Sequence, residues 1–305
     1  MNDSSYFKQA RILLSILPLI NKFPNFALKG GTAINFFVRN LPRLSVDIDL
    51  TFLPIEDRNR SLTEISSFLV QISHVLNRRL PKLKITLKRT RDTNAVNALI
   101  VNQRGIAVKI EPNLIVRGAV FPTEKLNLCK SAENKFGLTT RIKVLSVADL
   151  YGGKICAALD RQHPRDLFDI HFLLKNEGIT EQIRKAFIVY LISHPRPIVE
   201  LLNPNLKDIR DVYYQEFKGL TFEHLSLNDL TQTQNFLIQN VKNILTKEEK
   251  QFLISFKSLD PQWHLLGLDN IGKLPAVKWK LLNLEKMSKT KHQQALGKLI
   301  NCLSG

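Results

Sequence analysis

Two aspartates that stand two residues apart in an apolar run are the feature that most restricts how this chain can fold. They occur in LKGGTAINFFVRNLPRLSVDIDLTF, which covers residues 28–52. Side chains alternate between the faces of a strand, so Asp47 and Asp49 are expected on one face while Ile48 and Leu50 point to the core. Two neighbouring carboxylates repel each other unless a cation neutralises them, and such oxygen pairs suit Mg²⁺ that is bound with substrate phosphates. The stretch therefore predicts a metal site on a strand.

A pair of glycines before these aspartates leaves room for a phosphate. Gly30 and Gly31 permit close approach of the backbone to a ligand. Thr32 is expected to cap a helix over residues 33–40, whose N-terminal amides favour a phosphate. Ser45 is expected on the same face as the aspartates. The alternative for an isolated Asp-x-Asp is a surface strand after an ordinary turn, but the whole arrangement favours a nucleotide site.

Positive charge dominates the composition. Lys and Arg number 44 against 27 Asp and Glu, which gives a net charge of +17. This balance favours a polyanionic partner, and RNA, DNA and anionic lipid all satisfy it on charge alone. Such basic stretches are usually solvated faces, but at a cleft they would bind the phosphates of a structured RNA. Two dense stretches contribute: Arg78, Arg79, Lys82, Lys84, Lys88, Arg89 and Arg91, and then Lys278, Lys280, Lys286, Lys289, Lys291 and Lys298.

The cysteines and the apolar runs indicate a cellular setting. Cys129, Cys156 and Cys302 are odd in number and far apart, which fits a reducing compartment and neither a disulfide framework nor a zinc site. Cys156 stands among Ile and Ala residues and is expected in the core. The chain lacks a run of about 18 apolar residues. A soluble cytoplasmic protein without a membrane partner is therefore expected.

Hydrophobic periodicity predicts that strands are concentrated in the first part of the chain. The pattern predicts strands over residues 26–29, 83–87, 96–101 and 106–110, and helices over residues 5–21, 61–79, 147–161 and 165–175. After residue 180 the pattern is mainly helical, and Trp263 and Trp279 are expected to be packing anchors. An irregular stretch over residues 116–128 marks the expected boundary between a first domain, 1–120, and a second, 121–305.

The strand over residues 106–110 leads to a second pair of charged side chains. Lys109 and Glu111 alternate with Val108 and Ile110, so both are expected on one face. One interpretation is a solvated strand edge with a Lys/Glu pair. The other places both residues beside the aspartates, because the strands of residues 83–110 could extend the aspartate sheet.

The order of motifs in residues 28–52 resembles the nucleotidyltransferases of the polymerase-β-like superfamily. More narrowly, LKGGTAINFF followed by RLSVDIDLTF is similar to the AbiEii/AbiGii toxin family, which includes the MenT-type toxins. The resemblance implies an α+β fold, in which a polymerase-β-like core of helices on a mixed sheet is followed by a mainly helical part that completes the active site. It implies that Gly30, Gly31 and Thr32 hold a triphosphate while Asp47 and Asp49 hold Mg²⁺.

The same resemblance assigns roles to the second charged pair. A third acidic residue on a neighbouring strand completes the metal site in the superfamily, and Glu111 is the candidate, either as a metal ligand or as a base for the attacking hydroxyl. Lys109 is then a candidate for binding phosphate, as is Ser45. Many superfamily members have Gly-Ser in the turn where this chain has Gly-Gly-Thr. In this chain the Thr32 hydroxyl would therefore make the contact to the triphosphate that the serine makes in those members, or the contact would be absent.

A second motif, LYGGKICAALDRQHPRDLFDIHFLL over residues 150–174, is similar to the downstream motif of the AbiEii family. The resemblance implies that Lys154 and the Arg-Asp-x-x-Asp of Arg165, Asp166 and Asp169 face the active site. A lysine there would screen the triphosphate, and a carboxylate would orient the lysine or the acceptor. The alternative is structural, since Arg165 and Asp169 are four residues apart and can pair along one helix.

The resemblance implies a nucleotidyltransferase that moves NMP from an NTP to RNA, most plausibly to the 3′ end of a tRNA. The metal would be Mg²⁺, with Mn²⁺ as a substitute. The protein would be the toxin of a toxin–antitoxin or phage-defence system with a separately encoded antitoxin. Transfer to a protein or to a small molecule, and a noncatalytic nucleotide- or RNA-binding module, are the alternatives. The net charge of +17 argues against a cationic small-molecule acceptor.

Overall fold

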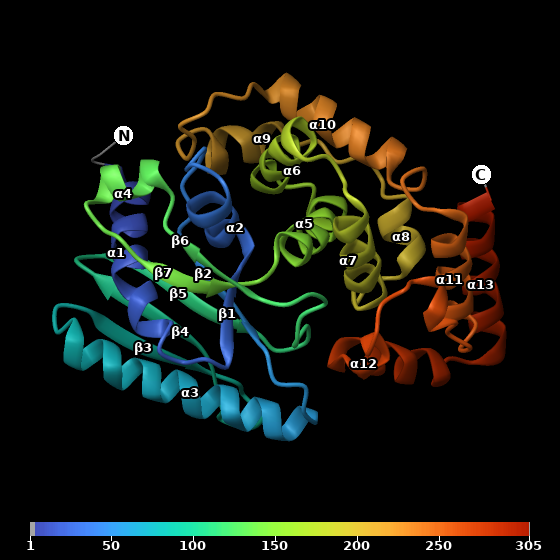
Figure 1. The fold of residues 1–305 in the computed structure, drawn as a ribbon, viewed down its shortest axis with the longest axis horizontal. Coiled ribbons are helices and arrows are strands. Elements are labelled where there is room, and N and C mark those ends of the chain that lie inside the picture. Colours follow the sequence, from blue (N-terminus) through green and yellow to red (C-terminus); the bar gives the residue numbers. More distant parts are fainter. Residues whose placement is uncertain (1–3, 305) are drawn as a thin grey trace. The chain divides into compact units, whose positions relative to one another are not determined.

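The computed structural model describes residues 4–304, so the outermost ends of the two expected domains lie outside it. The described chain divides into two compact units (Figure 1). Unit 1 comprises the chain up to Leu150 together with Phe217–His224, and unit 2 comprises Tyr151–Glu216 and the chain from Leu225 onward. Unit 1 holds a mixed sheet with helices and unit 2 is helical, which confirms the expected α+β class.

Unit 1 is organised around one sheet of seven strands within the described residues. Their order in space is β3-β4-β5-β2-β1-β7-β6. The pairs β2–β5 and β1–β7 are parallel, and the other neighbours are antiparallel. The bounds are β1 (Phe26–Lys29), β2 (Ile48–Phe52), β3 (Lys84–Arg89), β4 (Val96–Gln103), β5 (Ile106–Asn113), β6 (Glu124–Asn127) and β7 (Arg141–Val144).

The central strand β2 has the alternation that its sequence predicts. Ile48, Leu50 and Phe52 are each at most 1% exposed, whereas Asp49 between them is half-buried. The predicted meander is also present, because β3, β4 and β5 pair in sequence order and β5 then lies beside β2. Buried apolar side chains therefore fix β2 in the middle of the sheet and leave the Asp49 carboxylate on the opposite face.

Helices α1 (Ser5–Ile20) and α3 (Arg58–Arg79) pack on the sheet and contact each other (Figure 1). The ring of Phe68 on α3 meets Phe26 and Phe52, with centroids 5.9 and 6.4 Å away. Ser4 and Asp57 cap the two helices through their side-chain oxygens. These aromatic contacts and caps fix both helices against the strands that carry the site.

The sheet continues past the boundary expected at residue 120. β6 and β7 pair with each other, β7 adds to β1 in parallel, and helix α4 (Lys130–Phe136) lies between them in the chain. Residues 121–150 therefore belong to unit 1, although the sequence analysis placed them in the helical part. The two short strands, EKLN and RIKV, carry too many charged residues to give a clear apolar alternation.

A short segment from far along the chain also belongs to unit 1. The amide of Leu44 donates to the Leu220 carbonyl over 2.8 Å, and the amide of Phe222 donates to the Pro42 carbonyl over 2.8 Å. Arg43 and Thr221 form a bridge between these two hydrogen bonds. The loop that leads into the aspartates is thus held by residues about 180 positions later in the sequence, as the residue numbers show.

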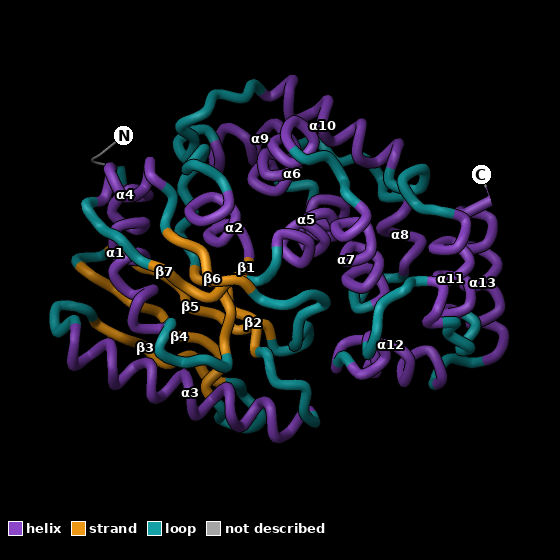
Figure 2. The backbone as a smooth tube through the Cα atoms, in the orientation of Figure 1, coloured by secondary structure: helices purple, strands orange, loops and turns teal. Residues whose placement is uncertain are grey.

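Unit 2 is built from helices, which Figure 2 shows in purple. Helix α5 starts in unit 1 after Ser146, whose hydroxyl caps it by accepting from the Asp149 amide over 3.0 Å. Arg184 on α7 donates to both Glu249 oxygens at 2.8 Å, and Glu249 also caps α11. The bounds are α5 (Val147–Arg161), α6 (Pro164–Asn176), α7 (Glu181–Ile192), α8 (Ile198–Leu202), α9 (Arg210–Val212), α10 (Leu227–Asn240), α11 (Lys247–Lys257), α12 (Pro275–Glu285) and α13 (Lys289–Ser304).

Helices α5 and α7 approach each other closely at Gly152. A Cβ atom at this position would lie 2.7 Å from the Phe187 amide nitrogen and 2.8 Å from the Ala186 carbonyl carbon. One turn later the Cys156 thiol lies 3.8 Å from the Phe187 carbonyl oxygen, and burial raises the pKa of this thiol. Cys156 is therefore part of the core, as its neighbours predict. In the described chain, no helix is both long and apolar enough to cross a bilayer.

The close approach at Gly152 gives a stability prediction with an internal control. Gly152→Ala should lower the free energy of unfolding by about 1–3 kcal/mol, because the new methyl group meets backbone atoms that cannot rotate away. Gly297→Ala, on α13, has no atom within 4 Å of its Cβ and should raise stability by about 0.5–1 kcal/mol. Urea unfolding of both variants measures the difference. Equal shifts would show that α5 and α7 do not pack this closely.

Candidate active site

The paired aspartates lie where β2 begins. Asp47 is the residue before the strand and Asp49 is its second residue. In the sheet Asp49 is opposite Lys29 on β1 and opposite Glu111 on β5. Register partners on adjacent strands place their side chains on the same face. The sheet thus brings Glu111 next to Asp49, as the family resemblance implies.

The glycine turn lies directly against the Asp49 carboxylate. Gly30 has a φ of +71°, which favours glycine, and a Cβ there would be 2.5 Å from Asp49 Oδ2. Any side chain at residue 30 would therefore push the carboxylate away or distort the turn. The turn and the carboxylate occupy one site because residue 30 has no side chain.

The second glycine lies under a buried arginine that the sequence analysis did not single out. A Cβ at Gly31 would lie 2.7 Å from a terminal guanidinium nitrogen of Arg43 and 3.1 Å from Ser45 Oγ. Arg43 is 2% exposed, and its Nη1 donates to the Leu44 carbonyl over 2.9 Å. A guanidinium beside a glycine turn is suited to phosphate oxygens. The sequence signal was an arginine within an otherwise apolar loop.

Thr32 does not cap the helix as expected. Helix α2 (Gly30–Ala33) begins before it, Lys29 is the N-cap residue, and the cap has no side-chain hydrogen bond. The Thr32 hydroxyl donates instead to the Asp47 carbonyl over 2.6 Å and lies 2.9 Å from Ser45 Oγ. The positive φ of Gly30 lets the chain enter the helix at once, so the threonine side chain is free to fasten the aspartate loop.

A π-helical turn, η1 (Ile34–Val38), replaces the α-helix expected up to Asn40. Within it, buried Asn35 donates from Nδ2 to the Gly31 carbonyl over 2.9 Å. The short π-helical turn therefore supports the backbone of the glycine turn from behind. Such turns are uncommon and occur often at functional sites.

Lys109 and Glu111 form an ion pair on the face of β5, and their side chains are 43% and 48% exposed. The shared face confirms the alternation predicted for this strand. In residues 4–304, no three Asp, Glu, His or Cys side chains gather closely enough to hold a metal ion. The backbone register nevertheless suits a pair of carboxylates at Asp49 and Glu111. Metal binding by Asp47, Asp49 and Glu111 stays a prediction.

In unit 2 the downstream motif forms a buried ionic cluster. Lys154 Nζ lies 2.9 Å from Asp166 Oδ1 and 3.0 Å from Asp169 Oδ2, with all three side chains at most 8% exposed. Breaking a buried ion pair by removing one partner typically costs about 3–5 kcal/mol, because a buried charge is left uncompensated. The cluster therefore joins α5 to α6 whatever further role its members have.

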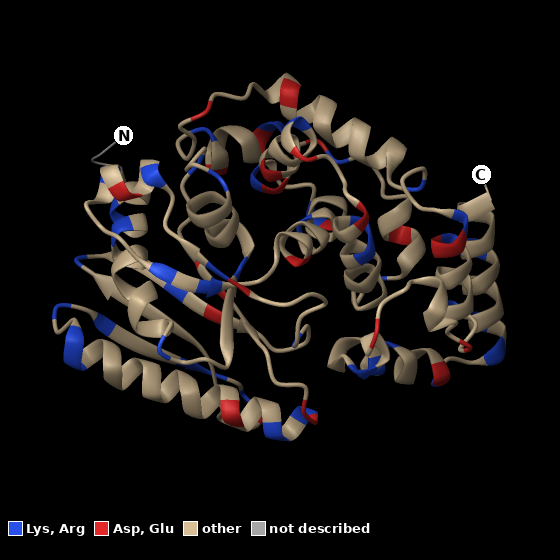
Figure 3. Cartoon of the chain, in the orientation of Figure 1, with Lys and Arg blue, Asp and Glu red and all other residues tan. Residues whose placement is uncertain are grey.

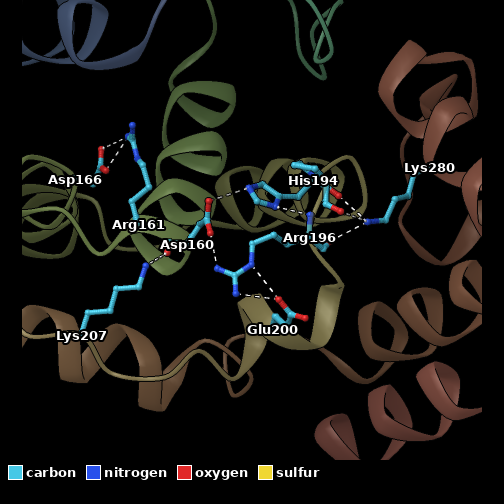
Figure 4. Close-up of polar contacts among 9 residues, drawn as sticks. Asp160, Arg161, Asp166, His194, Arg196, Glu200, Lys207 and Lys280 are labelled. Carbon is cyan, nitrogen blue, oxygen red and sulfur yellow. Dashed lines mark hydrogen bonds and ion pairs between the residues drawn. The ribbon is translucent and has the colours of Figure 1, made fainter. Parts of the chain in front are cut away.

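Arg161 is a member of this cluster that the sequence analysis did not assign to the site. Its Nη2 lies 2.8 Å from Asp166 Oδ2, and Figure 4 shows this contact at the end of α5. Arg165 is half-buried and forms no ion pair with another described residue, so the pairing with Asp169 along the helix, which was the structural alternative, is absent. Asp169 forms its ion pair with Lys154 instead.

Comparison with known proteins matches the two motifs to one family. The family model described as "Nucleotidyl transferase AbiEii toxin, Type IV TA system" matches residues 11–283. The chain belongs to this family. It is therefore a nucleotidyltransferase of the AbiEii type, and the resemblance that the sequence analysis drew is confirmed. No curated protein matches the chain.

The solved structure of a toxin shows the same fold. MenT4, a nucleotidyltransferase toxin from Mycobacterium tuberculosis H37Rv, superposes with a TM-score of 0.61 at 14% identity, covering 97% of this chain and 93% of that one. JHP933 from Helicobacter pylori gives a TM-score of 0.43 at 16% identity over 79% of this chain and 95% of that one. The likeness to MenT4 extends over both units of this AbiEii protein.

The contact between Gly30 and Asp49 predicts a selective loss of activity in this AbiEii enzyme. Gly30→Ala should lower nucleotide transfer by about 100-fold, since a misplacement of about 1 Å at a reacting centre has effects of that size. Gly105→Ala is the matched control, because Gly105 has a φ of +84° and no atom within 4 Å of its Cβ. Both variants should lose roughly 1–2 kcal/mol of stability from backbone strain. Equal transfer rates in the two variants would contradict the close contact.

Proposed function

We propose that this protein is the toxin of a type IV toxin–antitoxin system and transfers NMP from an NTP to an RNA acceptor, the 3′ end of a tRNA, in a Mg²⁺-dependent reaction. The observation that carries the proposal is the Gly30–Gly31 turn, which lies against the Asp49 carboxylate on one side and the Arg43 guanidinium on the other. A glycine turn between a carboxylate and a cation suits a metal-bound triphosphate.

The residues of unit 1 that would hold Mg²⁺, or Mn²⁺ in its place, are Asp47, Asp49 and Glu111. Gly30 supports this choice, because the missing Cβ leaves the Asp49 carboxylate open toward the turn. When bound, the metal would neutralise phosphate charge and polarise the α-phosphate toward attack. Glu111 would have to exchange its ion pair with Lys109 for the metal, which would leave the Lys109 ammonium to meet phosphate.

Other residues of unit 1 would position the substrate. Gly31 and Arg43 would bind phosphate oxygens through backbone amides and the guanidinium. Thr32 and Ser45 would act through Asp47, because the Thr32 hydroxyl holds the Asp47 carbonyl and touches Ser45 Oγ. The expected direct contact of Thr32 with the triphosphate is less favoured, since its hydroxyl already donates to the Asp47 carbonyl.

Unit 2 would contribute through its ionic cluster. Arg165, which precedes Asp166 but lies outside the cluster, is the residue of this motif best suited to phosphate, because its guanidinium pairs with no carboxylate in the described part of the chain. Lys154 and Arg161 together neutralise Asp166 and Asp169, and this cluster would act by setting the position of the helix that carries Arg165. Their roles at the active site are part of the proposal.

Surface charge supports an RNA acceptor. The seven basic residues between 78 and 91 are all exposed, and three of them lie on the edge strand β3 (Figure 3). Edge lysines also protect a sheet from pairing with other chains, which is the structural alternative. Four of the seven cations in these fourteen positions lie outside β3, where edge protection does not apply, and the concentration suits a phosphate backbone. The same proposal includes a role in phage defence and an antitoxin that is encoded separately.

The decisive experiment supplies each of the four α-³²P-labelled NTPs with Mg²⁺ and total cellular RNA. Label should enter a tRNA-sized band with the wild type and not with Asp49→Asn, because the amide cannot neutralise a bound cation. Asp92→Asn, which alters an exposed loop carboxylate of unit 1, is the matched control and should retain transfer. Label in protein or in small molecules would show that the acceptor is not RNA. Unchanged labelling by Asp49→Asn would overturn the assigned site.

The basic edge strand gives a separate prediction about the acceptor. Lys84→Gln combined with Lys88→Gln should weaken RNA binding and flatten its salt dependence by about 0.7–0.9 per lysine that contacts a phosphate. Binding of NTP alone should persist. Lys22→Gln combined with Lys125→Gln removes two other exposed lysines of unit 1, one of them from the opposite edge strand β6. Equal losses in both double variants would mean that net charge, and not β3, attracts RNA.

A further inference from the structure

A pocket of about 470 Å³ lies within unit 2, and its lining residues all follow residue 194 in the sequence. Its walls come from the loop before α8, from α8 itself, from the end of α11, and from α12 and α13. One face of α13 supplies residues at helical spacing, beginning with Lys291 and ending with Lys298 and Leu299. The volume is in the range of about 300–1,000 Å³ that small-molecule sites occupy.

The charges that line this pocket are not balanced. Four lysines line it, namely Lys257, Lys280, Lys291 and Lys298. The one carboxylate among the lining residues, Glu200, is already bound by Arg196, whose Nη2 lies 2.9 Å from Oε2 (Figure 4). Four cations around a space with no available anion attract an anionic ligand.

The deepest lysine is held in place by backbone carbonyls. Lys280 is 8% exposed, and its Nζ donates to the His194 carbonyl over 2.7 Å and to the Arg196 carbonyl over 2.8 Å (Figure 4). Burial, together with the nearby charge of Lys257, lowers the pKa of Lys280 to about 8. Burial also lowers the pKa of Lys257, whose Nζ has only the sulfur of Met287 within 4.0 Å among its described contacts. The Lys257 ammonium is therefore the cation best placed to bind an anionic ligand.

The remainder of the wall is apolar and includes one exposed indole. Ile198, Leu284 and Met287 line the pocket beside Trp279. Trp279 is 41% exposed, whereas Trp263 packs against Phe252 with centroids 5.7 Å apart. Trp263 is thus the packing anchor that the sequence analysis expected, and Trp279 presents an indole to the pocket. An indole beside several ammonium groups suits a planar base that carries a phosphate.

We propose that this pocket binds a single nucleotide, with the base against Trp279 and the phosphate near Lys257, Lys291 and Lys298. The confined volume favours one nucleotide over a peptide segment, and the several lysines favour phosphate over a single carboxylate. The nucleotide is either free in solution or an unstacked residue of a single-stranded RNA. The second source rests on the RNA acceptor proposed above.

The test uses the full-length Asp49→Asn protein, so that transfer chemistry does not interfere. Both tryptophans of the chain lie in unit 2, and stacking of a base on an indole quenches its fluorescence. The probes are AMP, GMP, CMP and UMP, and a single-stranded oligoribonucleotide of mixed sequence. Quenching should saturate with at least one probe and should vanish in Trp279→Phe, where Trp263 remains as the reporter.

Calorimetry with the same probe measures the contribution of each group. Trp279→Ala and Lys257→Gln should each weaken binding by about tenfold, the effect of losing one stacked base or one charge-assisted contact. Leu282→Ala, an exposed apolar residue on the same helix as Trp279, and Lys247→Gln, on the same helix as Lys257, lie outside the pocket lining and should bind as before. The control variants also show whether the helices remain folded.

The outcomes separate the two sources and the two proposals. Saturation by a mononucleotide identifies a free nucleotide, and saturation by the oligoribonucleotide alone identifies an RNA strand. If no probe saturates the quenching, or if the Lys257→Gln and Lys247→Gln variants bind equally, the pocket proposal is overturned. Transfer of label by the wild type would be unaffected by that result, because it depends on the aspartates of unit 1.

Discussion

The absence of a side chain at residue 30 is the constraint on which the arrangement of unit 1 depends. A Cβ atom there would lie 2.5 Å from the Asp49 carboxylate, so the turn and the acid share a space that only glycine leaves open. The register of β1, β2 and β5 then places Lys29 and Glu111 on either side of the same residue. The buried apolar partners Ile48 and Leu50 hold β2 in that register, because a slip by one residue would turn both aspartates toward the core.

Much of this arrangement follows from local patterns in the sequence. β1 and α5 have the predicted bounds, and the β3–β5 meander and the α3 and α6 helices lie within a few residues of theirs, because apolar spacing over one element determines them. The nearness of the glycine pair to the Asp-x-Asp was predictable to the same extent, since both lie within twenty residues and one supersecondary unit. Their role as an active site stays a prediction.

What the sequence did not reveal depends on partners that are remote along the chain. β6 and β7 are short and charged, and they become strands through pairing, β7 with β1 and β6 with β7. The Thr32 hydroxyl could have capped a helix, but in the folded chain it donates to the Asp47 carbonyl instead. Arg43 is held by pairing with Thr221, about 180 positions later in the sequence. Each of these outcomes needs a tertiary contact that no local window contains.

The return of Phe217–His224 to unit 1 has a consequence for how the protein is made. The loop before Ser45 is held by backbone hydrogen bonds to Leu220 and Phe222, so its partners are synthesised long after the glycine turn and both aspartates have left the ribosome. Until then the loop that leads into the acidic residues lacks these backbone partners. This enzyme, whose family members are toxins, therefore lacks the backbone hydrogen bonds of its aspartate loop during most of its own translation. Any partner that captures the nascent chain would meet it before the aspartate loop has closed.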